Sequence, residues 1–277
     1  MLTFHSMTTV TWLSVFTTVL LVSFGTRGIP LSAVGQFAIN MASSAKFSAH
    51  FVALIAILLL NKLELRFESL LAAPADYTQQ FQDWDRGFVG WIQGSLQSAW
   101  LTEGLSYMYL VVFHSLLVAS LVLYGSRTDR RLYYATCYAI MLNYGIAIPF
   151  FLFFPVNEVW VNDPTVQLRL LDVFPRFESE YRLLSGIDNC FPSLHTSISV
   201  TLAVLAQRSD NAKWAWLCSS CAVAIVFSIF YLGIHWFLDM AGGIALGLFA
   251  AHIGMRLSLQ APAGRMLRRL ASAGGGN

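Results

Sequence analysis

Charged residues are scarce in this sequence. Only 12% of its 277 residues are Asp, Glu, Lys or Arg, whereas 56% are hydrophobic, and the mean hydropathy is +0.60. Soluble globular domains carry about twice that share of charge. The composition therefore predicts an integral membrane protein surrounded by lipid, with no nucleic acid among its partners. We expect an all-α fold, a polytopic bundle of transmembrane helices.

Other signals are also missing. The first ten residues, MLTFHSMTTV, hold no Lys or Arg. They lack the positive start of a secretory signal, so we expect them to be retained. Low-complexity segments and internal repeats are absent. The four cysteines lie in or beside apolar runs, and the C-x-x-C pair Cys218 and Cys221 has no further ligand at metal-site spacing. We expect no redox or metal role for them.

Long apolar stretches are what the chain has in abundance. A spanning helix needs about 20 apolar residues. Seven candidates lie near 8–25, 45–61, 104–124, 133–154, 191–207, 214–234 and 236–256. The second is the weakest, because Lys46 and Lys62 bound it closely. The sequence thus predicts six or seven spans.

The connections between these stretches differ in charge. One alternate set holds eleven of the 17 basic residues, and the other set holds six together with 13 of the 15 acidic residues. Because the cytoplasmic side collects Lys and Arg, we expect the loops at 125–132 and 208–213 and the C-terminus to be cytoplasmic. The connections at 77–100 and 156–190 then lie outside, and we expect the plasma membrane as the location.

Two outer connections carry side chains of interest. Aromatic residues recur at helical spacing over 77–100 between Gln and Asp residues, which predicts an interfacial helix. Such a helix fits two roles, a packed anchor, which we favour, or a guide for lipid. The connection 156–190 holds Arg169, Arg176 and Arg182. Three arginines at the outer surface either bind an anion such as phosphate or simply face water.

Ionisable groups inside apolar stretches mark function by default. In FYLGIHWFLDMAGG, His235 and Asp239 lie four residues apart at the start of an apolar helix and so share a face. The carboxylate can fix one imidazole tautomer and leave the other ring nitrogen as a nucleophile or base. A structural polar pair or a metal site would show the same spacing.

The stretch DNCFPSLHTSISV, residues 188–200, favours a catalytic role for His235 and Asp239 over a structural pair or a metal site. Pro192 suits a first helical turn, and the backbone N–H groups from Ser193 to His195 would then start a helix, where an anion binds readily. Both helix starts fall on the outer side. His195, His235, Asp239 and Ser193 can therefore converge around a phosphate, with Asn189 as a further binding candidate.

These two stretches resemble motifs of the type 2 phosphatidic acid phosphatase superfamily. FPSLHT is similar to its second motif and SIFYLGIHWFLD to its third, and both look most like the inositol phosphorylceramide synthase branch. The resemblance covers roughly 140–256. It implies an enzyme that uses neither metal nor other cofactor, acts on a lipid phosphate, and passes the phosphoryl group to water or to an alcohol such as a polyol or a lipid headgroup.

The resemblance also implies roles for single residues. His235 would be the nucleophile that becomes phosphohistidine, oriented by Asp239. His195 would be the general acid for the leaving oxygen, and Ser193 would hold a phosphate oxygen. This division of work suits phosphoryl transfer, which asks mainly for positioning and charge stabilisation.

The sequence departs from the family pattern at its cations. Ile229 follows Ser228 where the third motif usually has Arg, and FPVNEVW, with Asn157 and Glu158, stands where a Lys and an Arg-Pro belong. The residues that usually hold phosphate are thus missing. Arg182, Arg176 and Arg169 become the candidates, with Arg182 first because it lies nearest to His195 in the sequence.

The chain divides by these features into three parts. We expect membrane helices with an outer interfacial helix over 1–103, a phosphatase-like catalytic bundle over 104–257, and a disordered cytoplasmic tail over 258–277. The function predicted is a lipid phosphatase or phosphotransferase with an outward-facing site. The alternative is a transporter or scaffold in which the histidines relay protons.

Overall fold

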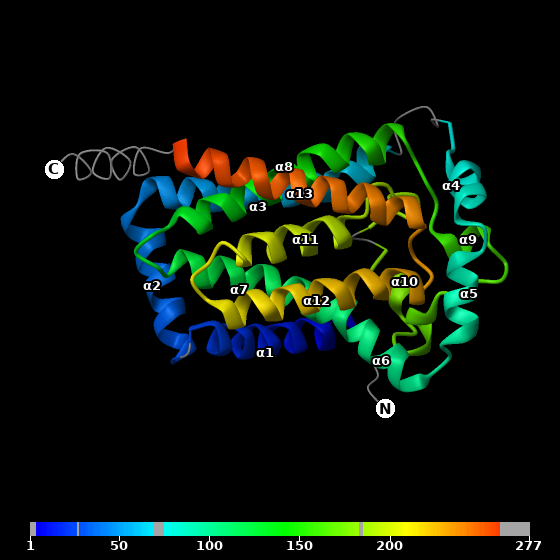
Figure 1. Cartoon of the computed structure of the whole chain (residues 1–277), viewed down its shortest axis with the longest axis horizontal. Coiled ribbons are helices and arrows are strands. Elements are labelled where there is room, and N and C mark those ends of the chain that lie inside the picture. Colours follow the sequence, from blue (N-terminus) through cyan, green and yellow to red (C-terminus); the bar gives the residue numbers. More distant parts are fainter. Residues whose placement is uncertain (1–3, 27, 69–74, 183–184, 261–277) are drawn as a thin grey trace.

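The computed structural model describes residues 4–26, 28–68, 75–182 and 185–260. Over these ranges the chain is helical and contains no β-strand beyond an isolated bridge between Val156 and Asn189. The predicted all-α bundle is confirmed (Figure 1). The predicted tail lies outside the described residues from 261 onward.

Within the described residues, six helices are long and apolar enough to cross a membrane. Their bounds are α1 Met7–Thr26, α3 Ala45–Glu68, the continuous α6 Ala99–Tyr107, η1 Met108–Val112 and α7 Phe113–Gly125, then α8 Arg131–Phe153, α12 Ala212–Tyr231 and α13 Phe237–Gln260. The weak second candidate therefore does form a helix of spanning length. The protein is a multi-pass membrane protein.

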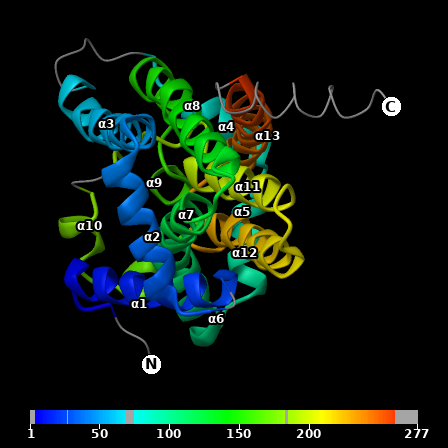
Figure 2. The same cartoon turned by 90° about the vertical axis from the view of Figure 1, so that its left-hand side faces the viewer.

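The fifth of the seven predicted spans, at 191–207, forms a shorter helix. Helix α11, Leu194–Ala206, has 13 residues and so measures about 20 Å, against about 30 Å for a hydrocarbon core. It lies in the middle of the bundle, packed against α8, α12 and α13 (Figure 2). Contact with α13 is close, because a Cβ atom on Gly247 would lie 2.4 Å from the carbonyl oxygen of Ser197. The start of α11 is thus enclosed by protein.

The connections gather at the two ends of the bundle, as alternating spans require (Figure 1). Helix α2, Pro30–Ser43, which the sequence analysis did not predict, joins α1 to α3 at one end. The opposite end holds the short elements α4 Thr78–Asp85, α5 Phe88–Ser95, α9 Val159–Asn162, η2 Arg169–Asp172 and α10 Phe177–Glu180.

The interfacial helix expected over 77–100 is broken, so that prediction is wrong in its continuity. Arg86 and Gly87 have φ angles of 50° and 78°, and this left-handed backbone ends α4 and starts α5. Trp84, Trp91 and Trp100 are 73%, 67% and 82% exposed. Large rings exposed at one end of the bundle suit a membrane interface.

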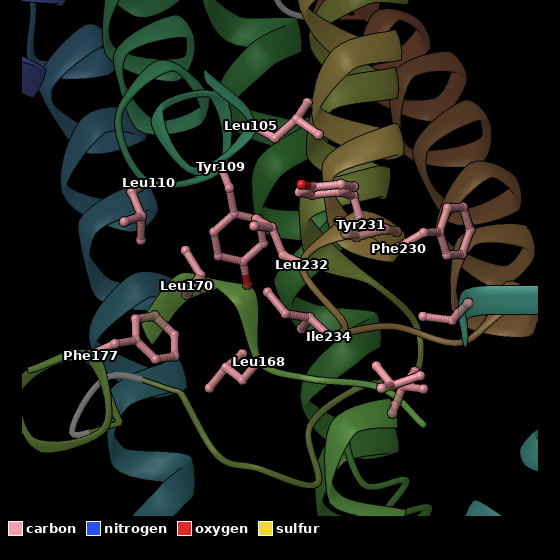
Figure 3. Close-up of a cluster of buried hydrophobic side chains, with 14 of the residues drawn as sticks. Leu105, Tyr109, Leu110, Leu168, Leu170, Phe177, Phe230, Tyr231, Leu232 and Ile234 are labelled. Carbon is pink, nitrogen blue, oxygen red and sulfur yellow. The ribbon is translucent and has the colours of Figure 1, made fainter. Parts of the chain in front are cut away.

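A buried cluster fastens the short elements to the spans at this end. It contains Tyr109 and Leu110 of η1 together with Leu168, Leu170 and Ile234 (Figure 3). Helices α1 and α3 pack on α7 and α8 respectively, so the predicted N-terminal and catalytic parts are in contact. The division at residue 103 stays a prediction.

Candidate active site

His235 and Asp239 meet at the start of α13. Gly233, with φ of 80°, reverses the chain after α12, and a Cβ atom there would lie 2.6 Å from the carbonyl oxygen of Gln167. The Nδ1 atom of His235 then lies 3.2 Å from Oδ2 of Asp239, which also accepts the Trp236 N–H at 2.8 Å. Asp239 is fully buried. The carboxylate therefore fixes the imidazole with Nε2 as the second, available nitrogen.

His195 faces this pair from the first turn of α11. Its ring stacks on Tyr109 at 3.9 Å between centroids and lies 4.4 Å from that of Phe113. The rings of His195 and His235 are 6.5 Å apart. The Nε2 atom of His195 is buried and has no hydrogen-bond partner among the described residues. A buried imidazole nitrogen without a hydrogen-bond partner is rare, which suggests that this atom bonds a substrate.

The π-helical turn η1 places the ring that stacks on His195. Such turns inside α-helices are rare and occur frequently at functional sites. Here η1 interrupts the α6–α7 span at Met108–Val112 and contributes Tyr109. The turn thus holds the orientation of His195 from a helix that is distant in the sequence.

A cavity of about 570 Å³ adjoins both histidines. Helix α1 forms one wall with a stripe of residues that includes Val10, Ser14 and Thr18, and α3 contributes Asn61. Glu158 and Asn189 also line it. The cavity joins a polar end at the histidines to a mainly apolar wall, which suits a molecule with a polar head and an apolar tail.

Two predicted binding residues are engaged within the protein. Ser193 is fully buried, and its Oγ caps α11 by accepting the Thr196 N–H at 3.3 Å. Its hydroxyl proton is still free to donate. Asn189 lines the cavity and donates from Nδ2 to Oε2 of Glu64 at 3.1 Å. Phosphate contact by Ser193 or Asn189 stays a prediction.

The three predicted arginines all pair with carboxylates. Arg182 donates from Nη1 to Oε1 of Glu158 at 2.7 Å and also bonds Glu178. Burial lowers the pKa of Arg182, but the bonds and charge of these carboxylates outweigh it and raise the pKa above its usual range. Arg169 and Arg176 lie 3.6 Å from Asp172 and Glu180. Arg182 is the one whose partner, Glu158, borders the cavity.

A metal could be considered at Cys190, His235 and Asp239, whose ligand atoms lie within 4.8 Å of one another. However, His235 and Asp239 already bond each other through Nδ1 and Oδ2. Burial raises the pKa of the Cys190 thiol, which makes it a poor ligand because metals bind the thiolate. The donor set therefore fits a metal badly.

Asp85 connects α4 to the catalytic turn. It is 5% exposed and accepts the N–H groups of Val89 and Phe237, at 3.2 and 3.3 Å. Burial raises the pKa of its carboxyl, and these hydrogen bonds oppose the rise. Asp85 therefore caps the N-termini of both α5 and α13, and its bond to α13 is made at Phe237, two residues after His235.

We expect Asp85→Ala to lower both stability and turnover. The substitution leaves the buried N–H of Val89 unpaired, at about 1–3 kcal/mol, and removes the acceptor of the part-buried N–H of Phe237, which frees the turn that carries His235. Thermal unfolding and turnover of the same preparation measure this. Asp83→Ala, at an exposed position of the same helix, is the control. Equal behaviour of the two variants would contradict the role given to Asp85.

Comparison with known proteins identifies the family of this chain. Residues 79–253 match the PAP2 superfamily. A putative undecaprenyl-diphosphatase of Escherichia coli K12 is 36% identical over 86 residues, which are 31% of this chain and 42% of that protein. The lipid A 4'-phosphatase of Porphyromonas gingivalis is 32% identical over 72 residues, 26% of this chain and 30% of that protein. No solved structure matches.

These matches cover different shares of the proteins compared. Each curated relative is matched over less than half of its own length, and neither name supports the inositol phosphorylceramide synthase branch. The family match is wider, because it covers more than half of this chain and contains Ser193, His195, His235 and Asp239. This protein belongs to the PAP2 superfamily.

Proposed function

We propose that the protein is a membrane enzyme that removes or transfers the phosphoryl group of a lipid phosphate through a phosphohistidine. One observation carries the proposal: His195 and His235 face each other across 6.5 Å at a cavity, one with an unpartnered Nε2 and the other oriented by Asp239. The names of both relatives, a diphosphatase and a lipid phosphatase, support a lipid phosphate or diphosphate as substrate.

The chemistry follows from the two rings. In the first step Nε2 of His235 forms a bond to phosphorus, the bond to the leaving oxygen breaks, and His195 gives its proton to that oxygen. Asp239 stabilises the positive charge that develops on His235. In the second step His195 takes a proton from the acceptor, whose oxygen bonds to phosphorus as the bond to His235 breaks.

The acceptor decides whether the enzyme is a hydrolase or a transferase. The relatives are named as phosphatases, which supports water. An alcohol acceptor, such as a polyol or a lipid alcohol, is supported by the FPSLH form that resembles the inositol phosphorylceramide synthase branch. Both outcomes share the same phosphoenzyme.

Purified protein incubated with a radiolabelled lipid phosphate, with and without glycerol or inositol, tests the proposal. Release of phosphate, an acid-labile labelled protein after quenching, and a phosphorylated polyol identify hydrolysis, the intermediate and transfer in turn. Absence of all three with a range of lipid phosphates and diphosphates would favour the proton-relay transporter instead.

We also propose an extracytoplasmic site at the plasma membrane, supported by the excess of Lys and Arg at the end that holds α2. Single cysteines at the exposed residues Thr165 and Asp210, in protein whose four native cysteines are replaced, test this. An impermeant thiol reagent should label intact cells at residue 165 and require permeabilised cells at residue 210. The opposite pattern would invert the topology.

A further inference from the structure

We propose that Asn61, Glu64 and Asn189 form a subsite in the wall of the catalytic cavity that accepts hydrogen bonds from a hydroxyl or ammonium group of the lipid substrate, close to its phosphate. The inference rests on the proposed phosphoryl transfer and adds a second point of substrate recognition. We name these three residues the acceptor cluster.

The acceptor cluster has three oxygens without a partner. Oε1 of Glu64, Oδ1 of Asn61 and Oδ1 of Asn189 are each buried and receive no hydrogen bond from the described residues. Glu64 as a whole is 2% exposed. Buried polar atoms are normally paired, because leaving one unpaired is costly. Three unpaired acceptors in one place therefore indicate a missing donor.

The acceptor cluster lies at the wall of the catalytic cavity. Asn61 and Glu64 are three residues apart and so lie on one face of α3. Asn61 and Asn189 line the same cavity as both catalytic histidines, and Glu64 reaches it through Asn189. Because the Nδ2 atom of Asn189 donates to Glu64, its amide is oriented and its oxygen is left for another partner.

The charge of this region selects the kind of ligand. Glu64 is a buried ionisable residue at the end of the spanning segment Ala45–Glu64, and ionisable residues in such segments mark function. Carboxylates repel phosphate but attract a hydroxyl or an ammonium group. Moreover, α3 lies outside residues 79–253, so two of the three residues of the acceptor cluster, Asn61 and Glu64, come from a helix beyond the family match.

A matched pair of lipids tests the acceptor cluster: lysophosphatidic acid and its 2-deoxy analogue, which differ by one hydroxyl group near the phosphate. We expect the wild type to favour the hydroxyl lipid by about tenfold in kcat/KM. Asn61→Leu should reduce that preference to about threefold or less. Thr18→Val, another polar position in the cavity wall that makes no such cluster, should keep it.

Stability separates recognition from a structural role. Because the Asn61 oxygen has no partner to lose, we expect Asn61→Leu to unfold, without lipid, at the same temperature as the wild type or higher. A structural asparagine would instead leave a less stable protein. Glu64→Gln, which removes the charge but can still accept a bond from Asn189, should show an intermediate preference.

Two further measurements show which molecule carries the donor group that binds the acceptor cluster. If the acceptor cluster serves a free alcohol, the wild type treats both lipids alike and Asn61→Leu captures less added glycerol as glycerol phosphate. This also supports acceptance of a hydroxyl but moves it to the second substrate. Loss of the lipid preference on adding EDTA would assign the oxygens to a divalent cation and overturn the proposal.

Failure of the proposed function can be recognised separately. If the wild type releases phosphate from neither lipid, the shift in melting temperature on adding each lipid still measures binding. A larger shift with the hydroxyl lipid, lost in Asn61→Leu, would retain the acceptor cluster without the enzyme. Equal lipid preference, glycerol capture and melting shifts in Asn61→Leu and wild type would overturn the proposal.

Discussion

Replacing His235 with alanine should abolish both turnover and the phosphoenzyme, whereas replacing His195 with alanine should slow turnover by about 10²–10⁴-fold. The difference follows from the geometry. His235 is held by Asp239 with Nε2 available, so its loss removes the atom that bonds phosphorus. His195 only moves a proton, and Tyr109 and Phe113 hold its ring for that task.

The leaving group makes this prediction sharper. A poor leaving group, such as a lipid alcohol, needs a proton as it departs, but p-nitrophenol does not. We therefore expect His195→Ala to retain formation of the phosphoenzyme from p-nitrophenyl phosphate at close to the wild-type rate, while hydrolysis of the phosphoenzyme slows. His235→Ala should fail with both substrates.

A burst experiment measures the two steps, with released p-nitrophenol reporting the first and phosphate the second. His252→Ala is the matched control, since His252 is an exposed histidine of α13. Asp239→Asn should give a slower burst with little change in KM, because it affects the orientation of His235 and not the binding of substrate. Full turnover in His235→Ala would exclude the phosphohistidine.

The catalytic pair could be predicted from sequence because its information is local. His235 and Asp239 are four residues apart, and Pro192 and Ser193 announce the helix that begins at Leu194. Spanning helices were predictable for the same reason, since length and apolar composition decide them. The break between α4 and α5 also has a local signal in Gly87, but the helical spacing of the aromatic residues on both sides of it favours a continuous helix.

What surrounds the pair depends on tertiary contacts. Nothing in MYLVV distinguishes it from ordinary apolar helix, so the turn that brings Tyr109 onto His195 could not be predicted. Glu64 lies three residues beyond the end of the second predicted span at residue 61, so apolar composition gives no signal for its role. The role of Glu158 depends on an ion pair with Arg182, 24 residues away.

Substitution of Arg182 should reduce turnover strongly, by about tenfold with lysine and more with alanine. The predicted first choice for holding the phosphate is already placed beside the cavity, but its planar fork bonds the two carboxylate oxygens of Glu158. A phosphate offers the same paired oxygens. We propose that phosphate takes the place of Glu158 at the Arg182 fork when substrate binds.

Glu158 gives the discriminating variant. If carboxylate and phosphate compete for Arg182, Glu158→Gln weakens the competitor, and inorganic phosphate should inhibit this variant at lower concentration than the wild type. If the pair is purely structural, Glu158→Gln only destabilises the protein, because the Arg182 charge, 15% exposed, keeps Glu178 but loses its more buried carboxylate partner. Thermal unfolding and phosphate inhibition, measured together, separate the two cases.

The other arginines complete the test. Arg176 has a side chain that is 68% exposed and pairs only with Glu180 among the described residues, whereas Arg169 is 19% exposed and lies by a smaller hollow near Ser98. Arg176→Ala should therefore behave as the wild type, and Arg169→Ala should reduce turnover less than Arg182→Ala does.

If Arg→Ala at 169, 176 and 182, singly and combined, leaves turnover and phosphate inhibition unchanged, no arginine of this connection holds the phosphate. The N–H groups at the start of α11 and the Ser193 hydroxyl would then have to stabilise the negative charge of the transferred phosphoryl group without a cation. A helix N-terminus carries only about half a unit of positive charge, so this stabilisation would be weak.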